Sequence, residues 1–286
     1  MIQKKVVTLI DSSSNHYYMN NFKNKNILIT GGASGIGKIM GRIFLEKGSN
    51  LIIWDINEEK INTTIAELSK VGSVSGYTVN IAQLEEVKTA YNEVIRNHQF
   101  IDVIINNAGI IVGKYFHEHS EKEIQQTMEI NANAPMYITH LFLQDMIKRN
   151  TGYICNIASS AGLISNPKMS VYAASKWSLL GWSDSLRLEM KKLNKSIGVT
   201  TVTPYYINTG MFDGVKSIIP ILKPEKVAKK VIRSIEKRKP IASMPWSIHF
   251  VRFFQGIFPI WFFDWFVGKT LGIYKGMDEF KGGKNK

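Results

Sequence analysis

The sequence predicts an α/β protein with one parallel sheet that is covered by helices on both faces. Short apolar runs alternate with helical patterns from residue 27 onward, and runs such as 51–54 and 103–105 are apolar at every position. Strands that are buried on both faces have this pattern. Because strand and helix alternate, right-handed crossovers are expected, which gives a doubly wound sheet of about seven strands.

The individual elements follow from these patterns. The predicted strands lie at 27–30, 51–54, 76–79, 102–106, 153–157, 197–203 and 241–244. The predicted helices lie at 36–47, 58–70, 82–97, 121–149, 171–194 and 224–238. Gly48 follows the first helix, where a glycine commonly ends one. No repeat or low-complexity linker divides residues 25–244, so this range is predicted to be a single domain.

Two segments flank that domain. Residues 1–24 are predicted to be a mobile leader, because their apolar stretch at 6–10 is too short for a signal-peptide core or a membrane span. Residues 245–286 form an extension with ten aromatic residues between 246 and 266, and the polar residues among them argue against a spanning helix. We expect this extension to be a lid, an oligomer contact or a segment on a membrane surface.

Composition and charge restrict the function classes. The single cysteine, Cys155, excludes an internal disulfide and a Cys-based zinc site and favours a reducing, cytoplasmic location. The net charge is +13, and residues 216–240 hold nine Lys or Arg, mostly on one face of a predicted helix. No nucleic-acid-binding motif accompanies this charge, so nucleic acid is not an expected partner. His117 and His119 lack an apparent third ligand, so no metal site is expected.

A glycine-rich turn, Thr-Gly-Gly-Ala-Ser-Gly-Ile-Gly, joins the first predicted strand to the first predicted helix at residues 30–37. A loop that binds the phosphates of a dinucleotide requires this context. Glycines let the backbone approach the pyrophosphate closely, and the helix N-terminus offers free N–H groups to it. We therefore expect a Rossmann-like cofactor site that includes Gly31, Ser34, Gly35, Ile36 and Gly37.

Asp55 indicates which dinucleotide binds. It ends the second predicted strand, eighteen residues beyond Gly37. A carboxylate at this place can accept hydrogen bonds from the ribose hydroxyls of NAD, whereas it would repel the 2′-phosphate of NADP. Asn57 is free to cap the next helix, so Asp55 is not needed for that role. The sequence therefore favours NAD(H) over NADP(H).

Tyr172 and Lys176 form the predicted catalytic pair. They stand at i and i+4 on one predicted helix, and Ser159 lies thirteen residues upstream of Tyr172. A phenol with a pKa near ~10 is a poor base at neutral pH, and we expect the Lys176 cation to lower this pKa. Tyr172 could then exchange a proton with a substrate oxygen to which Ser159 donates a hydrogen bond. Together with the glycine turn, this group predicts an oxidoreductase.

From about residue 25 to 240 the chain resembles the short-chain dehydrogenase/reductase family. The resemblance rests on the glycine turn, on Asn106-Asn107-Ala108-Gly109, on Asn131, and on the Ser, Tyr and Lys just described. It implies a catalytic domain at 25–244 in which Asn131, Ser159, Tyr172 and Lys176 are catalytic, with Asn131 holding a water in a proton relay. It also implies cofactor contacts by Asn80, Asn107, Ala108, Gly109, Tyr172, Lys176, Ile207 and Thr209.

Two positions depart from the family pattern. After the sixth predicted strand the chain reads Pro204-Tyr205-Tyr206, where the family usually has Pro-Gly. This bulky pair is expected to narrow the site near the nicotinamide. Asn80 stands where an acidic residue commonly contacts the adenine.

Within the family, residues 51–57, residues 207–212 and the hydrophobic tail look most like the retinol and 17β-hydroxysteroid dehydrogenase branch. This implies a lipophilic alcohol or ketone, resembling a retinoid, a steroid or a fatty alcohol, bound near Ser159, Tyr172 and Met211. It also implies a homodimer or homotetramer, and peripheral contact with a membrane.

Two alternatives stay open at this point. One is an NADPH-dependent 3-oxoacyl-carrier-protein reductase, because the basic face at 216–240 could bind an acidic carrier protein. The other is a dinucleotide-binding sensor or scaffold without turnover.

Overall fold

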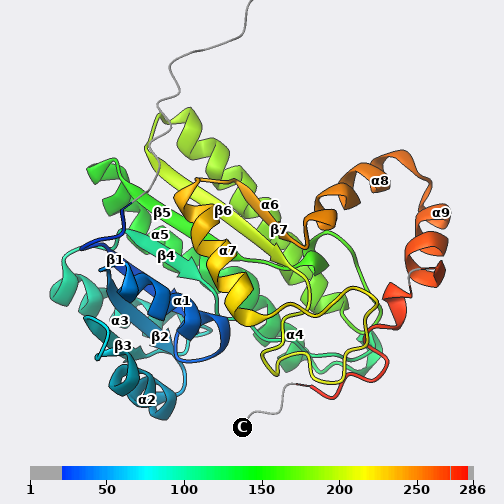
Figure 1. Cartoon of the computed structure of the whole chain (residues 1–286), viewed down its shortest axis with the longest axis horizontal. Helices are drawn as coiled ribbons and strands as arrows, with labels where there is room; N and C mark the ends of the chain where they lie inside the picture. The colour runs from blue at the N-terminus through cyan, green and yellow to red at the C-terminus, as the bar shows by residue number, and fades with distance from the viewer. Residues whose placement is uncertain (1–20, 271, 283–286) are drawn as a thin grey trace, which may run out of the picture.

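The computed structural model describes residues 21–270 and 272–282, and a seven-stranded parallel sheet lies at its centre (Figure 1). The strand order is β3-β2-β1-β4-β5-β6-β7. The strands are β1 (Asn26–Thr30), β2 (Asn50–Asp55), β3 (Val74–Thr78), β4 (Val103–Asn106), β5 (Gly152–Ile157), β6 (Ile197–Pro204) and β7 (Ile241–Met244). The predicted doubly wound sheet is confirmed.

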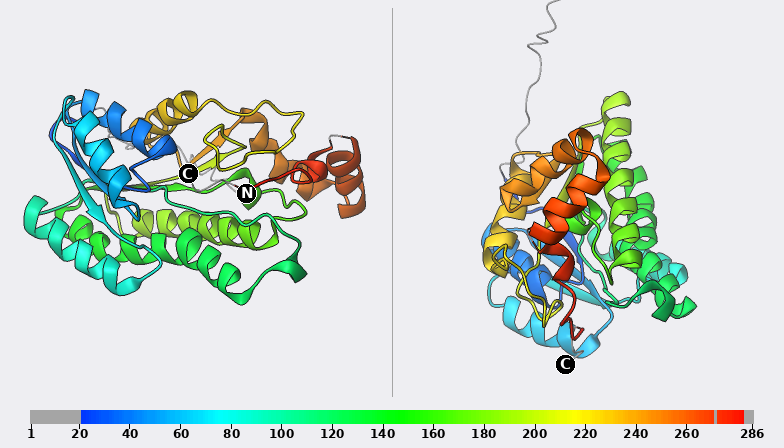
Figure 2. Two further views of the ribbon diagram at one scale, coloured as in Figure 1. Left: turned by 90° about the horizontal axis from the view of Figure 1, so that it is seen from below. Right: turned by 90° about the vertical axis from the view of Figure 1, so that its right-hand side faces the viewer.

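Helices cover both faces of the sheet, as the view along its edge shows (Figure 2). One layer holds α1 (Gly35–Glu46), α2 (Glu58–Leu68) and α7 (Pro224–Glu236). The opposite layer holds α3 (Leu84–His98), α5 (Ala134–Arg149) and α6 (Ser170–Lys192). α4 (Glu121–Met128) precedes α5 in the chain. This arrangement leaves the carboxyl ends of the strands as the accessible edge of the sheet.

Successive side chains of a strand point to opposite faces of the sheet, so each face has its own hydrophobic core. Ile27 and Ile29 of β1 pack toward α1 and α7, whereas Leu28 packs toward α5 and α6. All three side chains are fully buried. Burial of an aliphatic side chain of this size stabilises the fold by about 1.5–3 kcal/mol relative to exposure. Both faces of the central strands must therefore be apolar, which explains their continuous apolar sequence.

The predicted helix at 121–149 is interrupted, which corrects that prediction. α4 ends at Met128, one π-helical turn spans Glu129–Asn133, and α5 begins at Ala134. Pro135 explains the break, because a proline has no N–H to donate to the carbonyl of residue 131. Asn131 thus lies in the π turn rather than in a regular helix.

The two ends of the described chain differ: the first described residues pack on the domain, whereas the helices after β7 project from it. Residues 1–20 of the predicted leader are outside the described residues, and Phe22 packs edge-on against Phe44 at 4.9 Å. At the other end, α8 (Val251–Ile257) and α9 (Ile260–Asp264) project from the domain after β7 (Figure 1). Among the described helices, none is long and apolar enough to cross a membrane.

Candidate active site

The candidate site residues meet at the carboxyl edge of the sheet. The glycine turn follows β1, Asn107 and its neighbours follow β4, Ser159 follows β5 and Ile207 follows β6. These four strands are adjacent in the sheet, and the chain order reverses between β1 and β4. A doubly wound sheet binds its ligand in the crevice at such a reversal.

The glycine turn has the backbone that a phosphate-binding loop requires. Gly31 has a φ of +62°, in the left-handed region that favours glycine. A Cβ on Gly37 would lie 2.2 Å from the Gly31 carbonyl oxygen, so no larger residue fits there without a shift of the turn. α1 begins at Gly35, with Ser34 exposed before it and Ile36 buried beneath it. Its free N–H groups therefore lie at the carboxyl edge.

Thr30 joins the glycine turn to the Asn107 segment, and sequence reasoning did not assign it to the site. Its hydroxyl accepts hydrogen bonds from the backbone N–H groups of Asn107 at 3.0 Å and of Ala108 at 3.1 Å. The Asn107 amide donates in return to the carbonyls of Thr30 at 3.0 Å and Gly31 at 3.1 Å. Threonine is common in strands, so a threonine at the end of a predicted strand gave no sign of this role.

Asp55 lies beside the glycine turn, at the end of β2. Its carboxylate accepts hydrogen bonds from the backbone N–H groups of Ala33 and Asn57, both at 3.2 Å. Asn57 caps α2, with its side-chain oxygen accepting from the Lys60 N–H at 2.8 Å. Asp55 is therefore not the helix cap, and a half-buried carboxylate is held next to the loop that would carry a dinucleotide.

Thr209 lies in the segment after β6 and comes close to the glycine turn. A Cβ on Gly35 would lie 3.8 Å from a carbon of the Thr209 side chain, and the Thr209 N–H donates to the Ile207 carbonyl at 2.9 Å. Asn80 lies after β3, where its side-chain oxygen accepts from the Ala82 N–H at 3.1 Å and shapes the turn into α3. The predicted contact of Asn80 with adenine stays a prediction.

Asn131 ties the loop after β4 to α6. Its side-chain oxygen accepts from the Ile110 N–H at 2.9 Å, and its amide donates to the Ile110 carbonyl at 2.8 Å. The same amide donates to the Ser175 hydroxyl at 3.1 Å, and that hydroxyl donates to the Tyr172 carbonyl at 2.7 Å. Ser175 was missed in the sequence, although a serine next to Lys176 on the predicted helix was a possible signal of a buried polar contact.

Lys176 is fixed by the end of β5. Its ammonium donates to the Ile157 carbonyl at 2.9 Å and lies 5.8 Å from the centre of the Tyr172 ring. A Cβ on Gly109 would lie 3.5 Å from the Lys176 nitrogen and 3.1 Å from the Asn131 side-chain oxygen. The structure thus brings the four predicted catalytic residues and Gly109 into one group.

Burial dominates the ionisation of the catalytic pair. It raises the pKa of Tyr172 to about 12, and the hydrogen bond with the Ser159 side chain opposes this rise. It lowers the pKa of Lys176 to about 8. The expected stabilisation of the Tyr172 phenolate by the Lys176 charge stays a prediction. The spacing of the pair was visible in the sequence, but the loss of hydration of both groups was not.

Aromatic rings form the wall beside Tyr172. Phe212 lies edge-on to Tyr172, with ring centres 6.3 Å apart, and its neighbour Met211 is half-buried. Tyr206 packs against Phe212 at 5.0 Å and against Tyr205 at 4.5 Å. The bulky pair Tyr205-Tyr206 thus lies within the wall, and the ring in contact with Tyr172 is that of Phe212. The predicted contact of Met211 with substrate stays a prediction.

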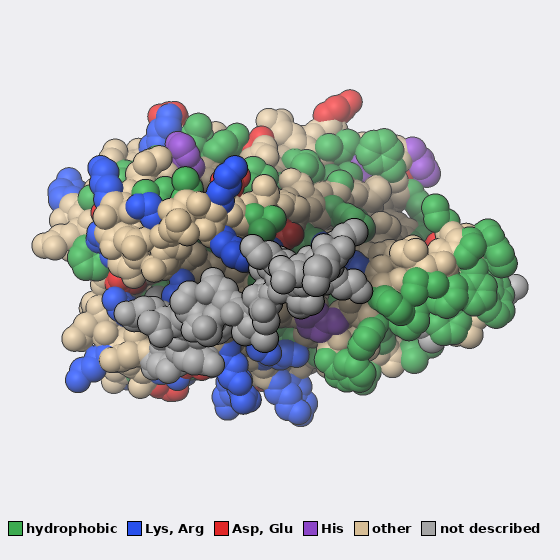
Figure 3. All heavy atoms as spheres, turned by 90° about the horizontal axis from the view of Figure 1, so that it is seen from above, with side chains coloured by type: hydrophobic (Ala, Val, Ile, Leu, Met, Phe, Trp, Pro, Cys, Tyr) green, Lys and Arg blue, Asp and Glu red, His purple; other side chains and the backbone are tan. Residues whose placement is uncertain are grey.

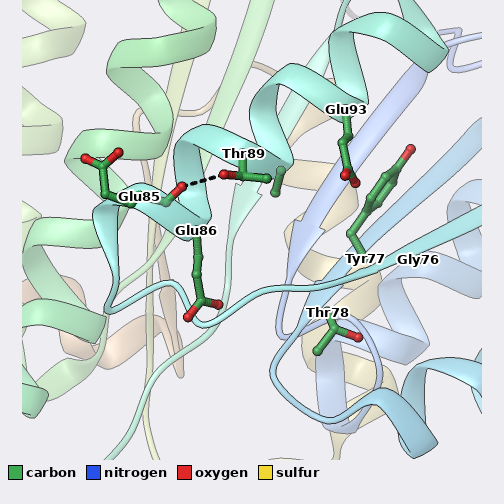
Figure 4. A pocket seen from close by; sticks show the side chains of 8 residues that line it. Gly76, Tyr77, Thr78, Glu85, Glu86, Thr89 and Glu93 are labelled. Carbon is green, nitrogen blue, oxygen red and sulfur yellow. Dashed lines mark hydrogen bonds between the residues drawn. The ribbon is translucent and has the colours of Figure 1, made fainter.

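Two hollows adjoin the described chain, and they differ in chemistry. The one at the catalytic group has a volume of about 20 Å³ and is lined by Ser159, Tyr206 and Ile273, among others. A larger one of about 480 Å³ lies between β3 and α3 and is lined by three carboxylates, those of Glu85, Glu86 and Glu93 (Figure 4). The acidic hollow suits neither a pyrophosphate nor an apolar substrate. Among the described residues, no group of three or more His, Cys, Asp or Glu could hold a metal ion.

The glycine turn, Asp55 and the buried Tyr172–Lys176 pair together define a dinucleotide-dependent oxidoreductase. Residues 25–218 match the family model described as short chain dehydrogenase. Over 267 residues the chain is 33% identical to epidermal retinol dehydrogenase 2 of Mus musculus, covering 91% of this chain and 86% of that protein. It is 31% identical to retinol dehydrogenase 10-A of Danio rerio, covering 81% of this chain and 78% of that one.

Solved structures show the same fold. A short-chain dehydrogenase/reductase from Burkholderia phymatum in complex with NAD has a TM-score of 0.76 at 22% identity, covering 82% of this chain and 94% of that chain. A metagenomic short-chain oxidoreductase in complex with NADP has a TM-score of 0.67 at 22% identity, covering 78% and 96%.

The chain therefore belongs to the short-chain dehydrogenase/reductase family, and its predicted resemblance to the retinol dehydrogenases is confirmed. It is an NAD(P)-dependent oxidoreductase that acts on CH–OH groups. The comparisons favour neither the carrier-protein reductase nor the sensor without turnover.

Proposed function

We propose that this enzyme transfers hydride between NAD(H) and a lipophilic alcohol or ketone, with Tyr172 as the general acid and base. The observation that carries the proposal is the buried Tyr172 phenol, with the Lys176 ammonium 5.8 Å from its ring centre and the Phe212 ring edge-on against it. This combination places a proton donor at the end of an apolar wall. A carbonyl on a hydrophobic molecule is the substrate that such a wall accommodates best.

The residues of the chain handle the substrate oxygen and its proton. The Ser159 oxygen accepts from the Ala161 N–H at 3.1 Å, and its hydroxyl hydrogen can be donated to the substrate oxygen when substrate is bound. The neutral phenol of Tyr172 donates its proton to that oxygen during reduction and receives it back during oxidation. The charged Lys176 stabilises the phenolate that forms as the proton leaves. The dinucleotide, when bound, supplies or accepts the hydride.

The preference for NAD(H) rests on Asp55. The residues present fit a dinucleotide, because the half-buried Asp55 carboxylate lies beside the glycine turn and a Cβ on Gly35, at the start of α1, would meet no atom nearer than 3.8 Å. A negative charge at that place repels a 2′-phosphate. We expect a higher kcat/KM with NADH than with NADPH, and a higher value with NADPH would overturn the assignment.

A panel of substrates, each assayed at the same NADH concentration, tests the substrate class. The panel contains a retinoid aldehyde, a steroid ketone, a long-chain ketone and a short polar ketone, together with a 3-oxoacyl-carrier-protein. We expect kcat/KM to be highest for the lipophilic members, because each buried CH₂ contributes about 0.8 kcal/mol. A preference for the acyl-carrier substrate or for the short polar ketone would contradict the proposal.

We also propose that residues 246–266 lie on an anionic membrane surface. Ten large apolar side chains in this range are exposed: Trp246, Phe250, Phe253, Phe254, Ile257, Phe258, Ile260, Trp261, Trp265 and Phe266. Figure 3 shows hydrophobic side chains gathered at this end of the molecule. Soluble proteins rarely expose so large an apolar patch, and aromatic rings favour the membrane interface.

The charge beside this surface favours anionic lipid. The pKa of His249 is lowered by burial and further by Lys230 and Lys239, so two cations lie within electrostatic reach of the aromatic segment. Lys and Arg side chains project at the lower edge of the view in Figure 3, next to the hydrophobic end. Each cation near an anionic bilayer contributes about 1 kcal/mol to binding.

Vesicle co-sedimentation tests this membrane contact. The variant Phe253→Glu/Trp261→Glu should lose binding to phosphatidylcholine vesicles that contain phosphatidylserine, because both side chains are exposed at the proposed interface. Val71→Glu, an exposed apolar position on the turn after α2, is the matched control and should bind as the unaltered protein does. Equal sedimentation of all three proteins would exclude the aromatic surface as the site of attachment.

A further inference from the structure

The C-terminal segment 273–282 closes the candidate active site. Ile273 lines the cavity that Ser159 also lines. Met277 and Phe280 pack in the same cluster as Tyr172. The fit is close, since a Cβ on Gly113 would lie 2.1 Å from the Phe280 ring. We call this segment the strap; it packs against the cluster that contains Tyr172 and supplies part of the cavity wall beside Ser159.

The cavity beneath the strap is too small for the proposed substrate. Its volume is about 20 Å³, whereas pockets that enclose a drug-sized ligand measure roughly 300–1,000 Å³. A volume of this size accommodates about one water molecule. A lipophilic alcohol can therefore enter this cavity beside Ser159 only if part of its wall moves. Most of the wall belongs to the domain core, while Ile273 belongs to the strap.

The strap is held by a few polar contacts with the domain, one of which runs from the Lys168 ammonium to the Asp278 carbonyl at 3.3 Å. The Lys216 N–H donates to the Gly276 carbonyl at 3.2 Å, and the Lys281 N–H donates to the Asp213 carbonyl at 3.1 Å. Lys216 also forms an ion pair with Glu279, and both side chains are exposed. An exposed ion pair contributes at most about 1 kcal/mol. Opening of the strap must break its apolar contacts through Ile273 and Met277 as well, and such local opening costs less free energy than global unfolding.

The strap also contacts the segment that carries the exposed aromatic rings. The Tyr274 hydroxyl donates to the Asp264 carboxylate at 2.5 Å. Ile273 packs with Val267 and Phe263 in one small cluster. A displacement of the helices before residue 266 would therefore act on the strap directly, through Asp264 and Phe263.

We propose that the strap is a lid, and that it opens when the aromatic surface 246–266 inserts into an anionic bilayer. Opening connects the catalytic cavity to the lipid, so that a lipophilic substrate passes from the bilayer to Tyr172. This inference rests on the proposed function, since a lid of this kind serves a substrate that is dissolved in the membrane. It adds a regulatory consequence: the site opens at the surface where its substrate is concentrated.

Hydrogen exchange of the full chain, measured by mass spectrometry with and without vesicles that contain phosphatidylserine, tests the lid. Amides of 250–266 should become protected, while amides of 273–282 and 213–217 should exchange about tenfold faster. A tenfold change corresponds to a decrease of about 1.4 kcal/mol in the free energy of opening. Unchanged or slower exchange in 273–282 would overturn the proposal, as would a lack of protection in 250–266.

The Phe253→Glu/Trp261→Glu variant separates lid opening from other effects of lipid. It should show no acceleration in 273–282 on addition of vesicles, whereas Val71→Glu should respond as the unaltered protein does. Acceleration that persists in the double variant would contradict coupling through the aromatic surface. Hydrogen exchange requires no turnover, so a failure of the lid is distinguishable from a failure of the proposed reaction, which the substrate panel reports.

Discussion

Tyr172 and Lys176 illustrate how burial and charge oppose each other within one helical turn. Both side chains are buried, and burial moves the pKa of each toward its neutral form. A neutral phenol with a pKa of about 12 is suited to donate a proton at pH 7, whereas taking a proton from an alcohol requires the Lys176 charge to stabilise a phenolate. The buried ammonium therefore carries a cost in stability that catalysis requires.

The variant Lys176→Met measures how much stability the buried ammonium costs. The pKa of Lys176 in the folded protein, about 8, is below its ordinary value of 10.5, so the folded state loses the proton first. The stability of the unaltered protein should therefore rise as the pH increases from about 8 to about 10.5. At pH 7 the variant should be more stable by roughly 2 kcal/mol, after allowing for the lost hydrogen bond to Ile157.

Chemical denaturation at several pH values measures this difference. The advantage of Lys176→Met should shrink toward pH 10, while its kcat should fall by about 10²–10⁴. Lys192→Met, at an exposed position at the end of the same helix, should change neither quantity by much. A stability advantage that is independent of pH would show that the buried charge is not its origin.

The glycine turn and the π turn are the elements that fix the site. The turn at residues 31–37 brings backbone N–H groups to the carboxyl edge, and the π turn at Glu129–Asn133 brings Asn131 to Ile110 and Ser175. Both are departures from regular structure, and π turns are frequent at functional sites. Each depends on a residue with unusual backbone properties, Gly37 in one and Pro135 in the other.

Gly37→Ala tests the first of these elements. The added methyl would lie 2.2 Å from the Gly31 carbonyl oxygen, so the turn must shift. We expect at least about a tenfold loss of NADH affinity, equivalent to about 1.4 kcal/mol. Calorimetry measures the affinity. Gly181→Ala in α6 is the control, because a Cβ there meets nothing within 4 Å, and it should stabilise the protein by about 0.5–1 kcal/mol. Equal affinities would show that the turn does not hold the cofactor.

At the scale of the whole molecule, the sequence predicted the sheet and most of the site. Near-continuous apolar runs identified central strands such as β2 and β4, because a strand that is buried on both faces of a parallel sheet has this pattern. The partly exposed edge strand β3 lacks it and was located by the alternation of strands and helices. Gly31, Ser159 and Tyr172 could be located because their chemistry is tied to a fixed spacing on neighbouring elements. Pro135 was a visible signal of the interrupted helix, and reading 121–149 as one helix overlooked it.

Long-range packing accounts for what the sequence did not reveal. Phe212 meets Tyr172 and Phe280 fills the space over Gly113 through contacts between distant segments, which no local pattern encodes. The rise in the pKa of Tyr172 that burial causes could not be predicted for the same reason, since burial depends on the assembled fold. The aromatic segment was visible by composition, but the packing of residues 273–282 against the cluster of Tyr172 was not.

Assembly is also a property of the whole molecule. We propose a homodimer or homotetramer formed through α5 and α6, as the family resemblance implies, and α6 exposes Trp177 and Leu188. Light scattering of the full chain in detergent should give two or four times the 32.4 kDa of one chain. A single-chain mass across the micromolar range would contradict this assembly.

The central claim is that Tyr172 moves the substrate proton during dinucleotide-dependent hydride transfer. The most direct measurement is kcat/KM for NADH-dependent reduction of a lipophilic ketone by Tyr172→Phe, with NADH affinity measured on the same preparation. Removal of the Tyr172 hydroxyl, the proposed proton donor, should lower kcat/KM by a factor of about 10²–10⁴ while NADH still binds. Tyr137→Phe, at an exposed tyrosine of α5, should keep full activity. Turnover by Tyr172→Phe within a few-fold of the unaltered enzyme would contradict the account.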